Sequence, residues 1–173
     1  MTKLQILLFI FMVMPFSALP GQTITILYTN NNNGNISACD CGEKPKGGLA
    51  RRKAVFDEFR KKTPSLLIVD AGDFLNGFGF NRAQDSLVIL LYTMLGYDAV
   101  NVGEQEFANG FDFFYRRVRS SSLPLVSSNI FYNDTLLSRP YVIKSLAGVR
   151  FGITGYTPQE SFRYLPNKHL LPV

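Results

Sequence analysis

The sequence of 173 residues contains no tryptophan, a single histidine and only two cysteines. So few cysteines exclude a small scaffold held together by several disulfides. A structural zinc site normally takes four ligands, which Cys39, Cys41 and His169 do not supply. A disulfide between two cysteines one residue apart would close a tight, strained ring. We interpret the two cysteines as a short loop clip or as free thiols, and a metal or redox role is the less favoured alternative.

The sequence also lacks an apolar run of about 20 residues, the length that spans a bilayer. Residues 4–16 form a shorter apolar run, preceded by Lys3 and followed by small residues at 17–21. This pattern is typical of a secretory signal peptide. We therefore predict a signal peptide over residues 1–21 and a domain over 22–173, secreted or periplasmic, with no stable membrane span. An uncleaved anchor is the less favoured alternative.

Long runs of one charge are missing as well, although the formal net charge is +5. Small basic clusters at 51–53, 60–62 and 116–119 are interpreted as solvated helix faces. A nucleic-acid interface would need a denser basic surface and a recognisable binding motif, so we predict no nucleic-acid partner. The charge is compatible with anionic ligands. Hydrophobic residues make up 46% of the chain, enough for a packed core in one domain.

Apolar runs alternate with segments of helical periodicity. Strands are expected at residues 24–29, 65–69, 98–102, 124–127, 141–145 and 149–154. Helices are expected at residues 48–62, 83–95 and 110–120. The order is β-α-β-α-β-α-β followed by a β-hairpin, which indicates an α/β fold with a parallel sheet and right-handed crossovers.

Polar turns that contain glycine follow the first three expected strands. They read TNNNNGN, DAGDFLNG and VGEQEFANG. Ligands of parallel α/β sheets bind outside the carboxyl ends of the strands, where these turns should converge. Each turn alone is compatible with ordinary Asn, Asp and Gly turn chemistry. The three together favour a site, or the remains of one.

The ordered motifs TNxxxG, GGLARR, DAGDxxxG, GYDAV, VGxxEFxNG and SSN resemble the 5′-nucleotidase branch of the calcineurin-like metallophosphoesterases. That branch includes UDP-sugar hydrolases and cyclic-nucleotide phosphodiesterases. The resemblance extends from about residue 24 to about residue 156. It implies the N-terminal part of a catalytic domain built as an αββα sandwich. This chain would supply one sheet and the first hairpin of the other, so the second sheet is expected to be largely missing.

The resemblance also implies a two-metal hydrolase, in which two cations hold a phosphate and activate a water for in-line attack. In the family pattern the first turn supplies an Asp and a His as metal ligands, where this sequence has Asn31 and Asn33. Asp73 matches the bridging Asp of the second turn. Glu104 occupies the position of an Asn ligand in the third turn. The remaining ligands of the family would come from sequence beyond residue 173.

Two further positions of the third turn, Gln105 and Ala108, correspond to the catalytic His and Asp of the family pattern. A Gln side chain cannot donate a proton to a leaving group as an imidazolium does, and an amide nitrogen is not basic enough to replace imidazole as a ligand. Loss of one positioned general acid or base typically lowers the rate about 10²–10⁴-fold. The glycines of the turns, by contrast, are retained.

Three hypotheses follow. The first is a secreted, catalytically impaired member of the family that acts as a binding or scaffold module, with a phosphate or nucleotide as ligand and no bound metal. The second is a phosphoester hydrolase with a rebuilt acidic site, in which Asp73 and Glu104 hold a weakly bound Mn, Zn, Mg or Ca ion. The third is a fragment of a split or truncated nucleotidase, whose uncovered sheet predicts a protein partner or a homodimer.

Overall fold

The computed structural model describes residues 21, 23–40, 42–79 and 81–165. The predicted signal peptide, Cys41 and His169 lie outside these residues, and the division of the chain at residue 21 stays a prediction. None of the helices in the described ranges is both long and apolar enough to cross a membrane.

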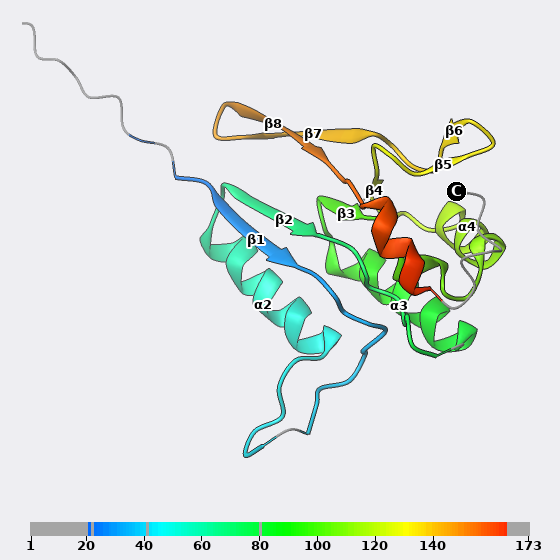
Figure 1. Ribbon diagram of the computed structural model, residues 1–173. Coiled ribbons are helices and arrows are strands. Elements are labelled where there is room, and N and C mark those ends of the chain that lie inside the picture. Colours follow the sequence, from blue (N-terminus) through cyan, green and yellow to red (C-terminus); the bar gives the residue numbers. More distant parts are fainter. Residues whose placement is uncertain (1–20, 22, 41, 80, 166–173) are drawn as a thin grey trace, which may run out of the picture.

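The centre of the structure is a four-stranded parallel sheet in the order β1-β2-β3-β4 (Figure 1). Its strands are β1 (Thr25–Thr29), β2 (Leu66–Asp70), β3 (Ala99–Asn101) and β4 (Leu125–Val126). The helices that connect them are α2 (Leu49–Lys62), α3 (Arg82–Leu95) and α4 (Phe111–Arg119). The predicted α/β architecture with a parallel sheet is therefore confirmed, and the element boundaries shift by one or two residues.

All three helices lie on one side of this sheet, and a β-hairpin lies on the other (Figure 1). The main core fills the space between sheet and helices, where side chains such as Phe56, Ile68, Val88, Tyr92 and Phe114 are buried. Three of the five side chains of β2 are buried apolar residues, because this strand has neighbours on both edges and packs against the helices. A continuous apolar run is what a strand in the middle of a parallel sheet requires.

The hairpin consists of β7 (Tyr141–Leu146) and β8 (Val149–Thr154), paired antiparallel around a tight turn. Ala147 and Gly148 have φ of 49° and 77°, the left-handed conformation that such hairpin turns use. A 2.5 Å ion pair between Lys144 and Asp98 ties the hairpin to the start of β3. Both hairpin strands were expected from the sequence.

A second small ribbon was not expected. Strands β5 (Phe131–Tyr132) and β6 (Thr135–Leu136) pair across Asn133 and Asp134, whose φ angles are 48° and 58°. An Asn-Asp pair tolerates the left-handed backbone of a two-residue hairpin turn, so the local signal existed. The strands themselves are two residues long and too short to show a periodicity. Two short 3₁₀ helices complete the described elements, η1 (Gln105–Phe107) and η2 (Gln159–Tyr164).

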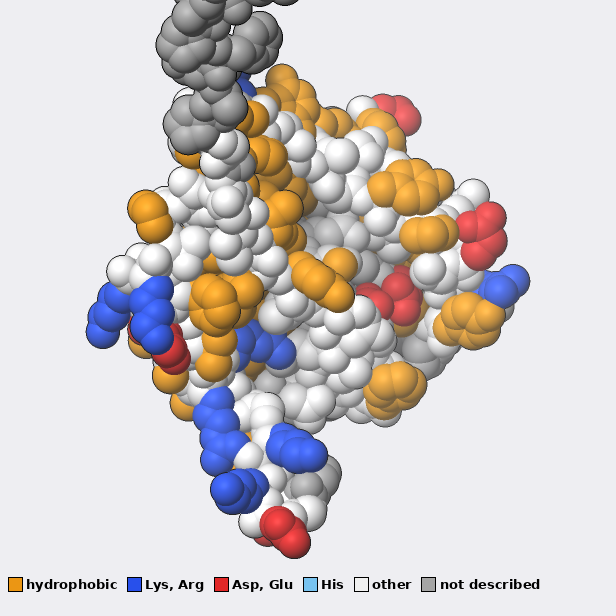
Figure 2. All heavy atoms as spheres, turned by 90° about the vertical axis from the view of Figure 1, so that its left-hand side faces the viewer, with side chains coloured by type: hydrophobic (Ala, Val, Ile, Leu, Met, Phe, Trp, Pro, Cys, Tyr) orange, Lys and Arg blue, Asp and Glu red, His pale blue; other side chains and the backbone are white. Residues whose placement is uncertain are grey.

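The sheet face opposite the helices is only partly covered. Leu27 packs against the core, so its neighbours Ile26 and Tyr28 point the other way and remain 53% and 75% exposed. A cavity of about 300 Å³ separates this face from the end of β8. Figure 2, which views the molecule from the left-hand side of Figure 1, shows a band of exposed hydrophobic side chains beside a hollow. The expectation of a partial sandwich is therefore confirmed.

Candidate functional site

The three polar turns meet at the carboxyl edge of the sheet, as the architecture predicted. Backbone hydrogen bonds of 3.0 Å join the first two turns: Asn31 and Asn33 donate their N–H groups to the carbonyls of Gly72 and Asp73. The third turn contacts the second through the side chain of Asp73, whose Oδ1 accepts a hydrogen bond from the backbone N–H of Gln105 at 3.3 Å. Three separate segments of sequence thus form one rim.

The backbone of this rim is unusual at three positions. Asn31, Asn33 and Asp73 have φ angles of 49°, 51° and 58°, in the left-handed region that residues other than glycine seldom occupy. Asn and Asp tolerate this region better than other side chains, because their short polar groups bond to nearby backbone. Such conformations concentrate at functional turns, where the surrounding structure holds them. The rim shares this conformation with such functional turns, although ordinary hairpin turns of this chain also adopt it.

The buried side chain of Glu106 connects the second and third turns from the interior of the fold. It is fully buried and accepts backbone N–H groups from Phe74 (2.7 Å), Leu75 (3.1 Å), Asp73 (3.2 Å) and Gly103 (2.6 Å). Burial and the nearby Asp73 raise the pKa of this carboxyl to about 8, against the effect of the backbone donors. Both oxygens are engaged, so Glu106 organises the rim and is not an open ligand. From the sequence, Glu106 is only a letter of the VGxxEFxNG motif, and this organising role was not predicted.

Asp85, in the first turn of α3, has a similar organising role that the sequence did not reveal. Its carboxylate accepts the backbone N–H of Asn76 at 3.1 Å and the side-chain amide of Asn109 at 2.6 Å. Burial raises the pKa of Asp85, and the two donors oppose that shift. One buried carboxyl thus holds the backbone of Asn76 and the side chain of Asn109, the asparagines of the two NG dipeptides.

Asp73 and Glu104, the two acidic residues predicted as ligands, are brought together. Burial and the adjacent Asp73 carboxylate, which is hydrogen-bonded to Glu104, raise the pKa of Glu104. Gly103 makes this approach feasible: a Cβ at that position would lie 2.8 Å from the backbone nitrogen of Asp73 and would overlap its carboxylate. The structure therefore places one pair of carboxyl groups at the rim.

The other four predicted positions differ in their surroundings. Asn31 is exposed, whereas Ala108 is buried in the core beside the rim. Asn33 and Gln105 are half-buried, and the side-chain oxygen of each is shielded from solvent without a hydrogen-bond partner. An unpaired buried acceptor costs about 1–3 kcal/mol, so two of them at one rim call for an explanation. Both are acceptors that a hydrogen-bond donor or a cation would satisfy.

These side chains do not fit the two-metal centre that the resemblance implies. Within the described ranges, His, Cys, Asp and Glu side chains form no group of three or more that could hold a metal ion. The two carboxyls and the amide oxygens of Asn33 and Gln105 are all oxygen donors, which suit Mg²⁺, Mn²⁺ or Ca²⁺ better than zinc. Two negative charges do not balance two dications.

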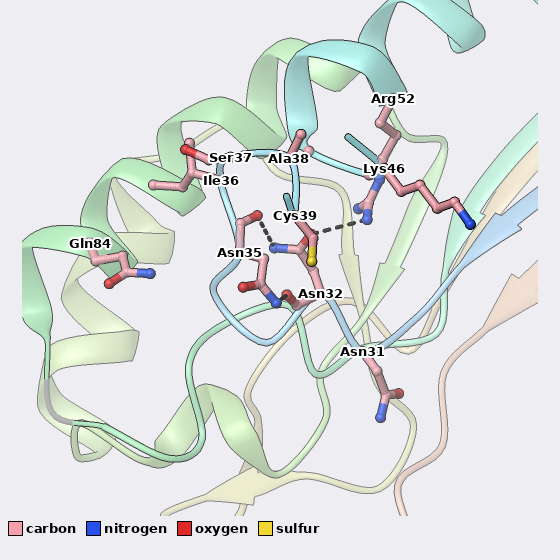
Figure 3. Close-up of a pocket in the computed structure, with 12 residues that line it drawn as sticks. Asn31, Asn32, Asn35, Ile36, Ser37, Ala38, Cys39, Lys46, Arg52 and Gln84 are labelled. Carbon is pink, nitrogen blue, oxygen red and sulfur yellow. Dashed lines mark hydrogen bonds between the residues drawn. The ribbon is translucent and has the colours of Figure 1, made fainter. Parts of the chain in front are cut away.

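A buried polar network supports the first turn from behind and accounts for the GGLARR and DAGD motifs. Arg52 donates to the hydroxyls of Tyr92 (2.9 Å) and Tyr97 (3.2 Å) and to the side-chain oxygen of Asn32 (3.0 Å). Figure 3 shows Asn32 between Arg52 and Asn35, to which it is also hydrogen-bonded. Arg52 thereby fixes the position of the turn between Asn31 and Asn33.

Asp70, at the end of β2, belongs to the same network. It accepts the hydroxyl of Thr29 at 2.5 Å and the backbone N–H of Gly72 at 2.9 Å. Burial raises the pKa of Asp70, and these hydrogen bonds together with the positive charge of Arg52 oppose the shift. The carboxylate joins the ends of β1 and β2 and is directed into the fold, so it is not available at the rim.

An open cavity of about 850 Å³ lies between the first turn and the start of α2 (Figure 3). Its polar lining includes Asn35, Lys46, Arg52 and Gln84, and none of its lining residues is acidic. Gly48 precedes α2 without a side-chain cap, and the first turn of that helix carries no acidic residue. A helix start and two cations make this cavity electropositive.

Cys39 lies at the edge of the same cavity and is disulfide-bonded. The free-thiol alternative is therefore wrong for this residue. Backbone hydrogen bonds between Cys39 and Lys46 close the base of the loop between them, at 2.8 and 3.0 Å. A disulfide-bonded cysteine at the base of a closed loop agrees with the interpretation of the cysteines as a loop clip.

No protein-family model matches the sequence. The chain is similar to Protein UshA of Yersinia enterocolitica, with 32% identity over 145 residues that cover 80% of this chain and 26% of that protein. The 5′-nucleotidase of Rattus norvegicus is 30% identical over 153 residues, which cover 80% of this chain and 27% of the relative. The chain thus spans about a quarter of the length of these curated relatives.

Solved structures give the same result for the fold. The crystal structure of a 5′-nucleotidase precursor from Thermus thermophilus has a TM-score of 0.66 and 27% identity, covering 80% of this chain and 29% of that chain. The Haemophilus influenzae NAD nucleotidase has a TM-score of 0.70 over 81% of this chain, and its 20% identity shows the fold alone.

Proposed function

Because this chain belongs to the 5′-nucleotidase family of calcineurin-like phosphoesterases and corresponds to its N-terminal part, we propose that it is a binding module in which hydrolysis is impaired or lost. One observation carries the proposal. The rim keeps its left-handed turns, but Asp73 and Glu104 are its only open carboxyls in the described residues, and amides stand at the ligand positions. The frame of a site is present, but amides replace the Asp and His ligands that the family pattern has in the first turn.

We propose that the ligand is a phosphate or a nucleotide, held in the cavity beside the first turn. At the rim itself the Asp73–Glu104 pair would repel a phosphate. The cavity on the other side of the turn offers Lys46, Arg52 and the start of α2, which no side chain caps. Helix starts that present N–H groups bind phosphates readily, and the amides of Asn35 and Gln84 add further hydrogen-bonding groups.

The test has two parts. Metal content is measured by elemental mass spectrometry on the purified chain before and after incubation with Mn²⁺ and Zn²⁺, and hydrolysis of AMP is assayed in parallel. The proposal expects fewer than two retained ions and no metal-dependent hydrolysis. Calorimetric titration with AMP then tests binding, where Lys46→Gln should weaken the affinity and Lys61→Gln on the far end of α2 should not. Metal-dependent AMP hydrolysis by the pure protein would overturn the proposal.

A second candidate function rests on the contact between Asp73 and Glu104. Together with the unpartnered oxygens of Asn33 and Gln105, this pair could hold one cation through oxygen ligands, as the rebuilt-site hypothesis requires. One ion of Ca²⁺, Mg²⁺ or Mn²⁺ per chain is the expected stoichiometry. Glu104→Gln should then lower the metal affinity, and an unchanged affinity would refute this candidate.

The share of the relatives that the chain covers also fits a fragment of a nucleotidase. We propose that a second copy or another protein covers the open sheet face around Ile26 and Tyr28. Light scattering would show a dimer or a complex, and a stable monomer at high concentration would argue against this. Export from the cytoplasm also remains a proposal, which N-terminal sequencing of the mature protein tests.

A further inference from the structure

The basic cluster on α4 differs from the cluster on α2 in its charge balance. On α2, ion pairs of 2.5–3.0 Å join Lys53 and Arg60 to Asp57, and Lys62 to Glu58. Helix α4 carries Arg116 and its neighbours Arg117 and Arg119 in its last turn. None of the four ion pairs found among the described residues includes an arginine of α4. The positive charge of α4 is therefore not neutralised within the described fold.

Arg82 joins this cluster from the first residue of α3. A cation at the start of a helix is disfavoured, because the N–H groups there already carry a partial positive charge. Even so, Arg82 is held in place: it donates to the carbonyl of Asn109 at 3.2 Å, and the side chain of Asn109 is fixed by the buried Asp85. A cation held against the local field of its own helix indicates a role other than helix stability.

The ring of Phe113 orders two of these guanidinium groups. The guanidinium of Arg82 lies 5.7 Å from the ring centroid, and that of Arg117 lies 6.0 Å from it. Cation–π contacts of this kind hold a guanidinium group over the ring and favour arginine over lysine. The two side chains therefore lose less freedom when they bind a ligand, which is the usual advantage of pre-organisation.

A cavity of about 530 Å³ lies over this cluster and is lined by Arg82, Asp112, Phe113, Arg116, Arg117 and Ser120. Three guanidinium groups face one carboxylate there, which leaves two positive charges. We propose that this cavity binds a phosphate or sulfate group of a small anionic ligand. The planar fork of arginine matches two oxygens of such a group, and a dianion would balance the two charges. The size is within the usual range for small-molecule sites.

Calorimetric titration of inorganic sulfate into the purified full chain tests this site. Saturable binding of one sulfate is expected, and Arg116→Gln/Arg117→Gln should weaken it about tenfold or more, through lost charge-assisted hydrogen bonds. The matched control is Lys61→Gln/Lys62→Gln, which removes two charges from α2 and should change the affinity less than about twofold, because exposed charges beyond a Debye length are screened. No saturable binding, or equal weakening in both double variants, would overturn the proposal.

A second variant and a second readout keep the result interpretable. Phe113→Leu leaves every charge in place but removes the ring that orders Arg82 and Arg117, so sulfate should bind several-fold more weakly. Amide NMR locates the bound sulfate, whose shifts should centre on residues 113–120. Shifts confined to residues 46–52 would refute the α4 site and point to the cavity of the proposed function. Conversely, loss of AMP binding in Lys46→Gln with sulfate binding unchanged would separate the two sites.

Discussion

Replacing Gly103 with alanine tests the close approach of the second and third turns. The added methyl would overlap the carboxylate of Asp73 and lie 2.8 Å from its backbone nitrogen. The carboxylate can rotate away, but the backbone nitrogen is held by its hydrogen bond to Glu106. Gly103 donates to the same oxygen of Glu106 at 2.6 Å. Relief of the overlap therefore requires the two turns to separate at their shared acceptor.

The expected loss of stability follows from these contacts. Overpacking typically costs about 1–3 kcal/mol, and each weakened hydrogen bond adds about 1 kcal/mol. Gly103→Ala should therefore lower the free energy of unfolding by about 2–4 kcal/mol in urea denaturation. Gly79→Ala is the matched control in the same turn region, since the nearest atom to its Cβ is the side-chain amide of Asn76 at 3.3 Å. That variant should stay within about 0.5 kcal/mol of the wild type.

A double-mutant cycle divides the effect between side chain and backbone. In an Asp73→Ala background the carboxylate is gone, so Gly103→Ala should cost less, but the overlap with the backbone nitrogen should keep part of the loss. If Gly103→Ala unfolds at the same urea concentration as the wild type, the two turns are not in contact as described. The pairing of Asp73 with Glu104 would then lose its structural basis.

The remaining predictions concern the two organising networks. Burial raises the pKa of Asp85 above its value in the unfolded chain, so its contribution to stability is fully present at low pH and falls as the pH rises through the folded pKa. The urea midpoint of the wild type should therefore decline more steeply from pH 4 upwards than that of Asp85→Asn. Parallel pH profiles of the two proteins would contradict this. Arg52→Lys should cost about 1–3 kcal/mol because an ammonium cannot reach Tyr92, Tyr97 and Asn32 together. Arg51→Lys, at an exposed neighbour, should change the unfolding free energy by less than about 0.5 kcal/mol, and urea denaturation of both variants checks the difference.

The sheet and its helices were predictable because their signals are local. The apolar run of β2 and the helical spacing of α3 are each contained in one segment, and Gly96 ends α3 with a φ of 71°. The convergence of the three turns followed from the rule for parallel sheets. The order of the predicted strands and helices was therefore correct, whereas the β5–β6 ribbon and the 3₁₀ helices η1 and η2 were missed.

The roles of the acidic residues were not predictable in the same way. Glu106 and Asp73 are 33 positions apart, and Asp85 and Asn109 are 24 apart, so no local pattern links them. In the sequence, any carboxyl in a polar turn is a possible metal ligand. Only the structure distinguishes Glu106, which is buried and organises the rim, from Glu104, which is partly accessible. Ala108 likewise reads as a vacant catalytic position, but its side chain is part of the core.

The division between organising and ligand positions explains how a chain can keep this fold while its ligands change. The hydrogen bonds that fix the rim run through Glu106, Asp85, Asp70 and Arg52, and none of them ends on the side chain of Asn31, Asn33 or Gln105. Loss of the side-chain polar groups at those three positions therefore removes none of these hydrogen bonds. The retained motifs contain mainly the residues that organise the rim, and few of the metal ligands. Their retention is therefore strong evidence for the fold and weak evidence for catalytic turnover.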